Sequence, residues 1–254
     1  MSDKPKVSGS SLSLSEVTAG YGGRPVVRDV SILVAPGEIV SIVGPNGSGK
    51  STLLKCVVGI VKIQSGRVLL NDRDITGHLP EDVARAGVGY VPQVDDVFGP
   101  LTVRENLEMG GYLLPAKQVP ANVERVLSTF PQLSRMLGRR AGKLSGGERK
   151  MLAMGRVLML APTLYVLDEP TANLAPAIAI QLLQEQVRQL AISGASILIV
   201  EQRARAVLKI SDRTYVLAGG QVRMEGTPQD LATSPAFVES FLGGAAERTS
   251  QIDG

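Results

Sequence analysis

The feature that most constrains this chain is a glycine-rich stretch near residue 50, set between two apolar runs. The run Ile39–Val43 predicts a buried strand, and Leu53–Val58 predicts a helix. Between them the sequence reads Gly-Pro-Asn-Gly-Ser-Gly-Lys-Ser-Thr, which fits the pattern G-x-x-x-x-G-K-[ST] in its proper setting of strand, loop and helix. The stretch therefore predicts a phosphate-binding loop in a nucleotide-binding protein.

Each residue type in this loop suits the binding of a nucleoside triphosphate. The glycines let the backbone turn tightly, so that its N–H groups point inward at an anion. The following helix adds its free N–H groups and the positive end of its dipole. Lys50 supplies a full charge to the β- and γ-phosphates, and the Ser51 hydroxyl can ligate Mg²⁺. The predicted nucleotide-binding residues of the loop are Gly44, Pro45, Asn46, Gly47, Ser48, Gly49, Lys50, Ser51 and Thr52.

The composition indicates a globular chain that can fill a core. Of its 254 residues 44% are hydrophobic and 20% charged, and 27 Lys and Arg against 24 Asp and Glu give a net charge of +3. This near balance gives no argument for a nucleic-acid partner, and none is expected. One of the longest uncharged runs, Gln189–Val200, has only 12 residues, whereas a membrane-spanning helix needs about 18 or more.

The order of the predicted elements indicates an α/β fold with an antiparallel sheet packed against a parallel core. The segments near the N-terminus predict strands at Leu12–Val17, Val26–Val34 and Gly66–Asp72. Later segments alternate between helix and strand, which is typical of parallel α/β architecture. Here the expected strands are Val88–Val91, Thr163–Leu167, Ser196–Val200 and Thr214–Leu217, and the expected helices are Pro80–Arg85, Gly147–Leu160, Ala175–Ile192 and Ala204–Ile210.

From Thr102 to Gly142 the pattern changes to helices joined by loops, after the predicted strand that ends at Val91. Thr102 and Glu105 form a capping box, in which each residue satisfies an exposed N–H group of the other, so a helix is expected to start there. A second helix is expected at about Ala121–Phe130, because the following proline ends it. We interpret this region as an inserted helical sub-domain.

The predicted domain organisation is one cassette with two irregular ends. The cassette covers residues 12–242, and its helical sub-domain covers about 95–155. Residues 1–11 are polar and without an apolar core segment, so they predict a disordered leader rather than a signal peptide. Residues 243–254 predict a flexible tail.

A second motif, an apolar strand that ends in two carboxylates, complements the phosphate loop. Leu164–Pro170 places Asp168 and Glu169 at the carboxyl end of the predicted strand, where ligands bind in open α/β sheets. Asp168 can hold Mg²⁺ through a water, and Glu169 can polarise the water that attacks the γ-phosphate. An acidic turn after a buried strand is the plain alternative, but the phosphate loop in the same chain favours the catalytic interpretation.

The sequence Leu-Ser-Gly-Gly-Glu at residues 144–148 predicts a second helix start suited to phosphate. Ser145 and Glu148 form an S-x-x-E capping box, while Gly146 and Gly147 clear side chains away from the first N–H groups. A well-capped helix alone would also explain these residues. Two half-sites in one chain nevertheless suggest that two chains share each nucleotide, and a strict monomer with Mg-ATP under blocked hydrolysis would contradict this hypothesis.

In this order the motifs resemble the nucleotide-binding subunit of ATP-binding cassette (ABC) transporters. The resemblance covers Leu12–Leu242 and implies a P-loop NTPase cassette with a RecA-like parallel core, an antiparallel β sub-domain and an inserted helical sub-domain. It also implies a head-to-tail dimer with two ATP molecules at its interface. Lys50, Ser51 and Gln93 would face one ATP, and the signature of a second chain would close on it, which involves its residues Ser145, Gly146, Gly147 and Glu148.

The resemblance implies roles for further residues. Tyr21 matches the aromatic residue that stacks on adenine, although a Tyr at the end of an ordinary strand would look the same. Gln93 would reach the Mg²⁺ together with Ser51 and Asp168, and would signal to a transmembrane subunit. Glu169 would act as the catalytic base, and the other expected catalytic residues are Lys50 and Gln202.

Several stretches narrow the resemblance to the second ATP-binding subunit of high-affinity branched-chain amino acid importers: Val91–Gln93, Val97-Phe98, Leu101–Tyr112, Asn173–Pro176 and Leu198–Gln202. Such a subunit powers import by ATP-driven closure of the dimer followed by hydrolysis, with ATP and Mg²⁺ as cofactors. It lies at the cytoplasmic face of the inner membrane. Its implied partners are permease subunits, a second ATPase subunit of the same or a different kind and, indirectly, an extracytoplasmic solute-binding protein.

Two departures from the general ABC pattern bear on hydrolysis. Gln202 stands where most cassettes carry a switch histidine, and Ala175 stands where many carry an aspartate. A glutamine can donate a hydrogen bond to the γ-phosphate but cannot carry charge. His78, the only histidine, lies in a polar loop. A cluster of basic residues surrounds the signature in the sequence: Arg139, Arg140, Lys143, Arg149 and Lys150. These residues either help to orient a phosphate or a partner, or they form a solvated helix face.

Other functions remain open at this point. The chain could serve another transport branch, for urea, an amide, another amino acid or the export of a lipid. A cytosolic ABC protein acting on DNA or ribosomes is disfavoured, because the stretch between Lys50 and Asp168 has no sustained heptads and the chain holds a single cassette. The solute is not encoded in this chain, because specificity resides in the permease and the binding protein.

Overall fold

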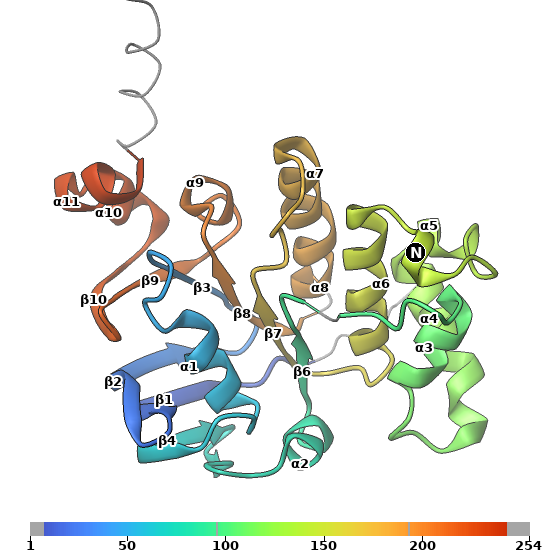
Figure 1. Ribbon diagram of the computed structural model, residues 1–254, viewed down its shortest axis with the longest axis horizontal. Coiled ribbons are helices and arrows are strands. Elements are labelled where there is room, and N and C mark those ends of the chain that lie inside the picture. The colour runs from blue at the N-terminus through green and yellow to red at the C-terminus, as the bar shows by residue number, and fades with distance from the viewer. Residues whose placement is uncertain (1–7, 95, 193, 243–254) are drawn as a thin grey trace, which may run out of the picture.

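The computed structural model describes residues 8–94, 96–192 and 194–242 and is built on two sheets (Figure 1). The smaller sheet is antiparallel, with order β2-β1-β4-β5, and comprises β1 (Leu12–Tyr21), β2 (Arg24–Val34), β4 (Ile63–Leu70) and β5 (Arg73–Asp74). The larger sheet has the order β10-β9-β3-β8-β7-β6 and is parallel except where β10 meets β9. Its strands are β3 (Ile39–Val43), β6 (Val88–Val91), β7 (Leu164–Asp168), β8 (Ser196–Glu201), β9 (Arg213–Ala218) and β10 (Gln221–Gly226). The predicted α/β architecture is confirmed.

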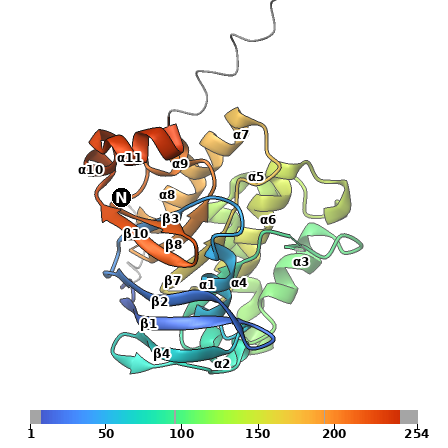
Figure 2. The same ribbon diagram turned by 60° about the vertical axis from the view of Figure 1, so that its left-hand side comes forward.

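Helices cover both sheets, and those between β6 and β7 gather at one end of the molecule (Figures 1 and 2). The helices are α1 (Lys50–Val57), α2 (Pro80–Arg85), α3 (Val103–Gly110), α4 (Val119–Thr129), α5 (Pro131–Ser134), α6 (Gly146–Leu158), α7 (Pro176–Gln181), α8 (Arg188–Ile192), α9 (Ala204–Val207), α10 (Pro228–Thr233) and α11 (Pro235–Phe237). Short 3₁₀ turns lie at Ala116–Gln118 and Ala141–Lys143, and π-helical turns at Leu182–Val187 and Val238–Leu242. The expected leader and tail fall mostly on residues 1–7 and 243–254, outside the described residues.

The central strands separate two hydrophobic cores, because successive side chains of a strand point to opposite faces. On β7, Leu164 and Val166 belong to the core that contains the antiparallel sheet and α1, whereas Tyr165 and Leu167 belong to the core beneath α6 and its neighbours. The same alternation holds on β3 and β8. The sequence therefore fixes which face each polar residue at the end of a strand will join.

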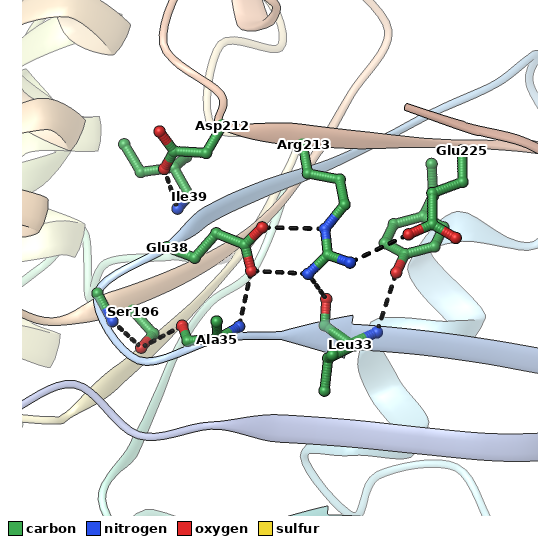
Figure 3. A network of polar contacts seen from close by, with 10 residues as sticks. Leu33, Ala35, Glu38, Ile39, Ser196, Asp212, Arg213 and Glu225 are labelled. Atoms are coloured by element: carbon green, nitrogen blue, oxygen red, sulfur yellow. Dashed lines mark hydrogen bonds and ion pairs between the residues drawn. The ribbon is translucent and has the colours of Figure 1, made fainter. Parts of the chain in front are cut away.

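Arg213 links the two sheets at the start of β9 (Figure 3). Its Nε and Nη2 donate to the two carboxylate oxygens of Glu38 at 2.9 and 2.8 Å, and its Nη1 donates to Glu225 on β10 at 3.0 Å. Nη2 also donates to the carbonyl of Leu33 on β2 at 3.2 Å. The hydrogen bonds to Glu38 are the main reason that the pKa of Arg213 is raised. One planar guanidinium thus joins β2, β9 and β10 far from the carboxyl ends of the parallel strands.

The structure corrects several predicted elements. Helix α4 begins at Val119 rather than near Ala121, because a proline is tolerated in the first turn of a helix. The expected single helix over Ala175–Ile192 is interrupted by the π-helical turn at Leu182–Val187. Strand β10 and helix α10 were not predicted, although Gly219-Gly220 marks the turn before β10 and Thr227 caps α10 through Asp230.

Candidate functional site

The predicted motifs meet at the carboxyl ends of the parallel strands. Strands β3, β8, β7 and β6 are neighbours in that order, so the segments that leave them share one edge of the sheet. The phosphate loop follows β3, Glu169 follows β7, Gln202 follows β8 and Gln93 follows β6. This edge is where open α/β sheets bind their ligands.

The phosphate loop is built with unsatisfied donors. Helix α1 starts after Gly49, which has φ +99° and provides no side-chain cap, whereas α3, α6 and α10 each close their N-terminus with a capping box. A Cβ at Gly49 would lie 2.6 Å from Cγ1 of Val27, so only glycine fits. The hydroxyl of Ser48 is buried without a hydrogen-bond partner. A helix N-terminus without a side-chain cap and an unpaired hydroxyl fit a bound phosphate chain.

Lys50 is the buried cation of this site. Its Nζ donates to the carbonyls of Gly44 and Pro45 at 2.8 and 3.0 Å and lies 4.0 Å from Oε1 of Glu169. Burial lowers the pKa of Lys50, while Glu169, Asp168 and Glu201 oppose that shift. Charged phosphate oxygens would be stronger acceptors than the two carbonyls.

Ser51 and Asp168 form the candidate magnesium ligands. The Ser51 hydroxyl donates to Oδ1 of Asp168 at 2.8 Å, and the Tyr90 hydroxyl lies 3.3 Å from Oδ2. Asp168 meets Ser51 because it shares the face of β7 that packs toward α1. Burial raises the pKa of Asp168, and the hydrogen bond from Ser51 opposes the shift. Adjacent hydroxyl and carboxylate oxygens suit Mg²⁺.

Within the described residues no group of three or more His, Cys, Asp or Glu could hold a metal ion. Mg²⁺ usually keeps several waters and is bound through one or two carboxylates together with substrate phosphates. Gln93, predicted as a further ligand, donates its amide to Glu169 in this structure.

Glu169 is held between two amides. Nε2 of Gln93 and Nε2 of Gln202 both donate to its Oε2, at 2.9 and 2.8 Å. Its backbone has φ +44°, a left-handed conformation that is strained for a residue with a side chain. Such strain persists only where the surroundings impose it, and it clusters at functional sites. The three residues predicted around the γ-phosphate, Glu169, Lys50 and Gln202, are therefore brought together.

The signature residues form the predicted capping box on α6. The Glu148 N–H donates to the Ser145 hydroxyl at 3.3 Å, and the Ser145 N–H donates to the Glu148 carboxylate at 2.7 Å. A Cβ at Gly146 or Gly147 would lie 2.9 Å from a methyl of Leu174 or Ile178, respectively. Both glycines are thus also required by packing against the segment after Glu169, a reason that the sequence did not reveal.

The structure does not bring the signature to the phosphate loop of the same chain. In the described part of the chain, no hydrogen bond or ion pair joins residues 145–148 to residues 44–52. The signature lines a separate hollow of about 370 Å³ together with Asn173, Leu174 and Ala175. The predicted Tyr21 lies at the end of β1 and is 53% exposed, which leaves its ring open to a ligand.

The predicted basic cluster is divided by the fold. Lys150 is buried on α6 and donates to Oδ2 of Asp96 and to the carbonyl of Gln93, both at 2.7 Å. Arg156 of the same helix donates to the backbone carbonyl of Asp96 and stacks 4.4 Å from the centroid of the Phe98 ring. The solvated-face interpretation is therefore wrong for Lys150. These contacts tie the segment after Gln93 to the signature helix, and no local pattern marked Asp96.

Comparison with known families identifies the chain. Residues 27–172 match the family model described as ABC transporter. The chain belongs to the ABC transporter family. A relative from Pseudomonas aeruginosa, the high-affinity branched-chain amino acid transport ATP-binding protein BraG, is 41% identical over 92% of this chain and 100% of its own length. A probable branched-chain amino acid transport ATP-binding protein, LivF of Archaeoglobus fulgidus, is 39% identical over 90% and 97%.

Other relatives broaden the comparison. The lipopolysaccharide export system ATP-binding protein LptB of Acidithiobacillus ferridurans is 36% identical over 91% of this chain and 96% of its own. A crystal structure of an ATP-binding cassette of an ABC transporter in its ADP conformation superposes with a TM-score of 0.83 at 31% identity, over 92% of this chain and 99% of that one.

The family settles the coarse activity of the chain. It is the ATP-hydrolysing subunit of an ABC transporter, a class whose ATPase subunits pair with one another and with permeases. Among the helices of the described residues, none has both the length and the apolar character needed to cross a bilayer.

Proposed function

We propose that this chain powers an importer of branched-chain amino acids by ATP-driven closure of an ATPase dimer followed by hydrolysis. The observation that carries the solute class is the similarity to BraG and LivF, which extends over nearly the full length of both relatives. The similarity to LptB favours a second candidate, a subunit of a lipid exporter. If the solute is urea, an amide or another amino acid, the chain would still power an importer in the same way.

The contacts at the strand ends support a division of labour around one ATP. Lys50 and the N–H groups at the start of α1 would bind the β- and γ-phosphates, and Tyr21 would stack on the adenine. Ser51 and Asp168 would hold Mg²⁺, with Gln93 moving from Glu169 to the metal. When bound, the ion would neutralise charge on the phosphates.

Glu169 would act on the attacking water. Its carboxylate would accept a proton as the water oxygen bonds to the γ-phosphorus, while the bond to the bridging oxygen of ADP breaks. The proton would then leave to phosphate or solvent. Gln202 would donate to a γ-phosphate oxygen, which requires that it release Glu169. Both amides are neutral, so they can exchange acceptors without moving a charge.

A second ATPase subunit would complete each site. The separation of Ser145–Glu148 from the phosphate loop supports a head-to-tail dimer in which the signature closes on the nucleotide of the other subunit. The N–H groups of Gly146 and Gly147 lie between the two capping residues, take no part in the capping box and would face that nucleotide. The partner is either a second copy or a related ATPase.

A groove beside the Gln93 segment supports a permease contact at Val97–Tyr112. It has a volume of about 360 Å³ and lies among α2, β6, α3 and α6, where its lining includes Val83, Met109 and Val157. Tyr112 at its rim is 81% exposed. Lys150 contacts Gln93, and Arg156 contacts Asp96 and Phe98 in the same segment, so a permease bound here would act on the segment that contacts Glu169.

The proposal is tested by isolating the complex with the membrane and binding proteins encoded beside this chain. We expect the chain to co-purify with the permeases from membranes, and Tyr112→Arg to abolish this while leaving ATP binding unchanged, because a charge at the rim opposes an apolar contact. The neighbouring binding protein should bind leucine, isoleucine or valine in calorimetry. Binding of a lipid, or the absence of any permease, would contradict the proposed import.

The neutral switch residue leads to a pH prediction. In Gln202→His, the imidazole should become charged below about pH 6.5. An imidazolium beside Glu169 stabilises the carboxylate and weakens it as a base. We therefore expect the ratio of variant to wild-type kcat to fall as the pH is lowered through that value, measured as phosphate release at saturating Mg-ATP. A ratio that stays flat between roughly pH 5.5 and 8 would show that a charge at residue 202 does not act on Glu169 during turnover.

A further inference from the structure

Glu201 is a buried carboxylate to which none of the roles above refers. It is the last residue of β8 and only 2% exposed. Its Oε1 accepts the N–H of Thr171 at 3.0 Å, and it is further hydrogen-bonded to the Thr171 side chain and the backbone of Arg203. Burial raises the pKa of Glu201, and these hydrogen bonds oppose the shift. A charged group is kept this deep only where specific partners hold it.

The partner of Glu201 lies two residues after Glu169. Because side chains alternate along β8, Glu201 shares the face of Ile197 and Ile199 rather than that of Val200. It therefore faces the segment that leaves β7, where the Thr171 N–H donates to it. The Thr171 N–H is buried as well, and without Glu201 it would lose its acceptor.

Three consecutive residues at the end of β8 hold the segment that contains Glu169. The carbonyl of Val200 accepts the N–H of Glu169 at 3.0 Å, Glu201 accepts the N–H of Thr171, and Gln202 donates to the Glu169 carboxylate. Between these attachment points the backbone of Glu169 has its left-handed φ of +44°. A strained conformation of this kind relaxes unless contacts on both sides prevent it.

We propose that Glu201 is a positioning residue for hydrolysis: its carboxylate fixes Thr171 and thereby keeps Glu169 in the strained conformation that aims its side chain at the attacking water. The proposal rests on the proposed role of Glu169 as the base. A hydrogen-bond acceptor at position 201 is what this role requires. An electrostatic role, in which Glu201 helps to keep Lys50 charged, requires the negative charge instead.

Two substitutions separate these requirements. Glu201→Gln keeps an oxygen that can accept the Thr171 N–H and removes the charge, whereas Glu201→Ala removes both. We expect Glu201→Gln to retain kcat within about threefold and Glu201→Ala to lose about 30- to 100-fold, because a misplaced catalytic group costs that much. The KM for ATP and the Kd of a fluorescent ATP analogue should change less than about threefold in both. Glu81→Ala, at an exposed position on α2, is the matched control.

The measurement is phosphate release by the full chain at saturating Mg-ATP, with thermal unfolding recorded for each variant. Normal turnover by Glu201→Ala would overturn the proposal, and so would equal losses in the Gln and Ala variants, which would assign the effect to charge. If Glu201→Ala does not fold, Glu201→Met replaces it at similar volume. If neither folds, Glu201 serves stability and the positioning role is overturned.

Glu169→Gln, assayed in parallel, separates the two levels of the proposal. Turnover by Glu169→Gln would overturn the role of Glu169 itself. An inactive Glu169→Gln combined with unaffected Glu201 variants would overturn only the positioning role of Glu201.

Discussion

Replacing Glu169 with Gln is expected to lower ATP turnover by at least about 100-fold without weakening ATP binding. The amide has the same shape as the carboxylate but cannot accept a proton from the attacking water. It also removes the negative charge 4.0 Å from Lys50, which leaves that cation more available to phosphate. The loss should therefore fall on kcat, and the Kd for ATP should stay equal or decrease. The measurements are phosphate release at saturating Mg-ATP and equilibrium binding of a fluorescent ATP analogue.

The same variant tests whether ATP closes a dimer. If the signature of one subunit completes the site of another, blocked hydrolysis should trap the closed form, and Mg-ATP should double the mass in sedimentation velocity. Glu124→Gln, an exposed change on α4, is the control and should turn over normally. Full phosphate release by Glu169→Gln would remove Glu169 from the role of base. A strict monomer with Mg-ATP would contradict the hypothesis that two copies of this chain share each nucleotide.

The parts of the fold that the sequence predicted are those with local signals. Ile39–Val43, Pro80–Arg85 and Val88–Val91 have the predicted bounds in the structure. Each is an apolar run or proline-led turn bounded by glycine or proline, so the boundary is written in neighbouring residues. The capping boxes at Thr102 and Ser145 were predicted for the same reason.

The contacts that could not be predicted join residues far apart in the chain. Arg213 binds Glu38, Lys150 binds Asp96 and Glu201 binds Thr171, and in each case the sequence shows only an ordinary charged residue. Such a partner is determined by the packing of strands and helices, not by spacing. In the site, the phosphate loop and the acidic pair could be predicted from the sequence, because their residue types and spacing indicate their chemistry. Gln93 and Gln202 were predicted only through the family resemblance, because a single glutamine in a sequence does not indicate a functional site.

Gln93 links the proposed catalytic residue Glu169 to one of the long-range contacts that the sequence did not reveal, the pair formed by Lys150 and Asp96. Gln93 bonds Glu169 through its side chain and Lys150 through its carbonyl. Lys150 lies on the helix that begins with the signature. Lys150 therefore connects α6 to the residue that contacts Glu169, and its buried pair with Asp96 lies at this connection.

Removal of one member of that pair is expected to destabilise the protein strongly. In Asp96→Ala, Lys150 would remain in a site where its side chain is only 9% exposed, without the carboxylate that lies 2.7 Å from its Nζ. An uncompensated buried charge of this kind costs about 3–5 kcal/mol of unfolding free energy. Asp82→Ala is the matched control, because Asp82 pairs with Arg85 at the surface with 53% and 59% of the two side chains exposed. That pair should contribute less than about 1 kcal/mol.

A third variant separates the buried charge from the pairing itself. Asp96→Ala combined with Lys150→Met removes the cation as well, and we expect it to recover most of the lost stability, because apolar replacement of a buried ion pair is often neutral. The measurement is chemical denaturation of the full chain for all variants. Equal small losses in Asp96→Ala and Asp82→Ala would contradict burial of the pair. The double variant could regain stability and still hydrolyse ATP more slowly than wild type. Stability would then not explain why the chain keeps two charges in its interior, and the pair would be assigned to the connection between Gln93 and the signature helix.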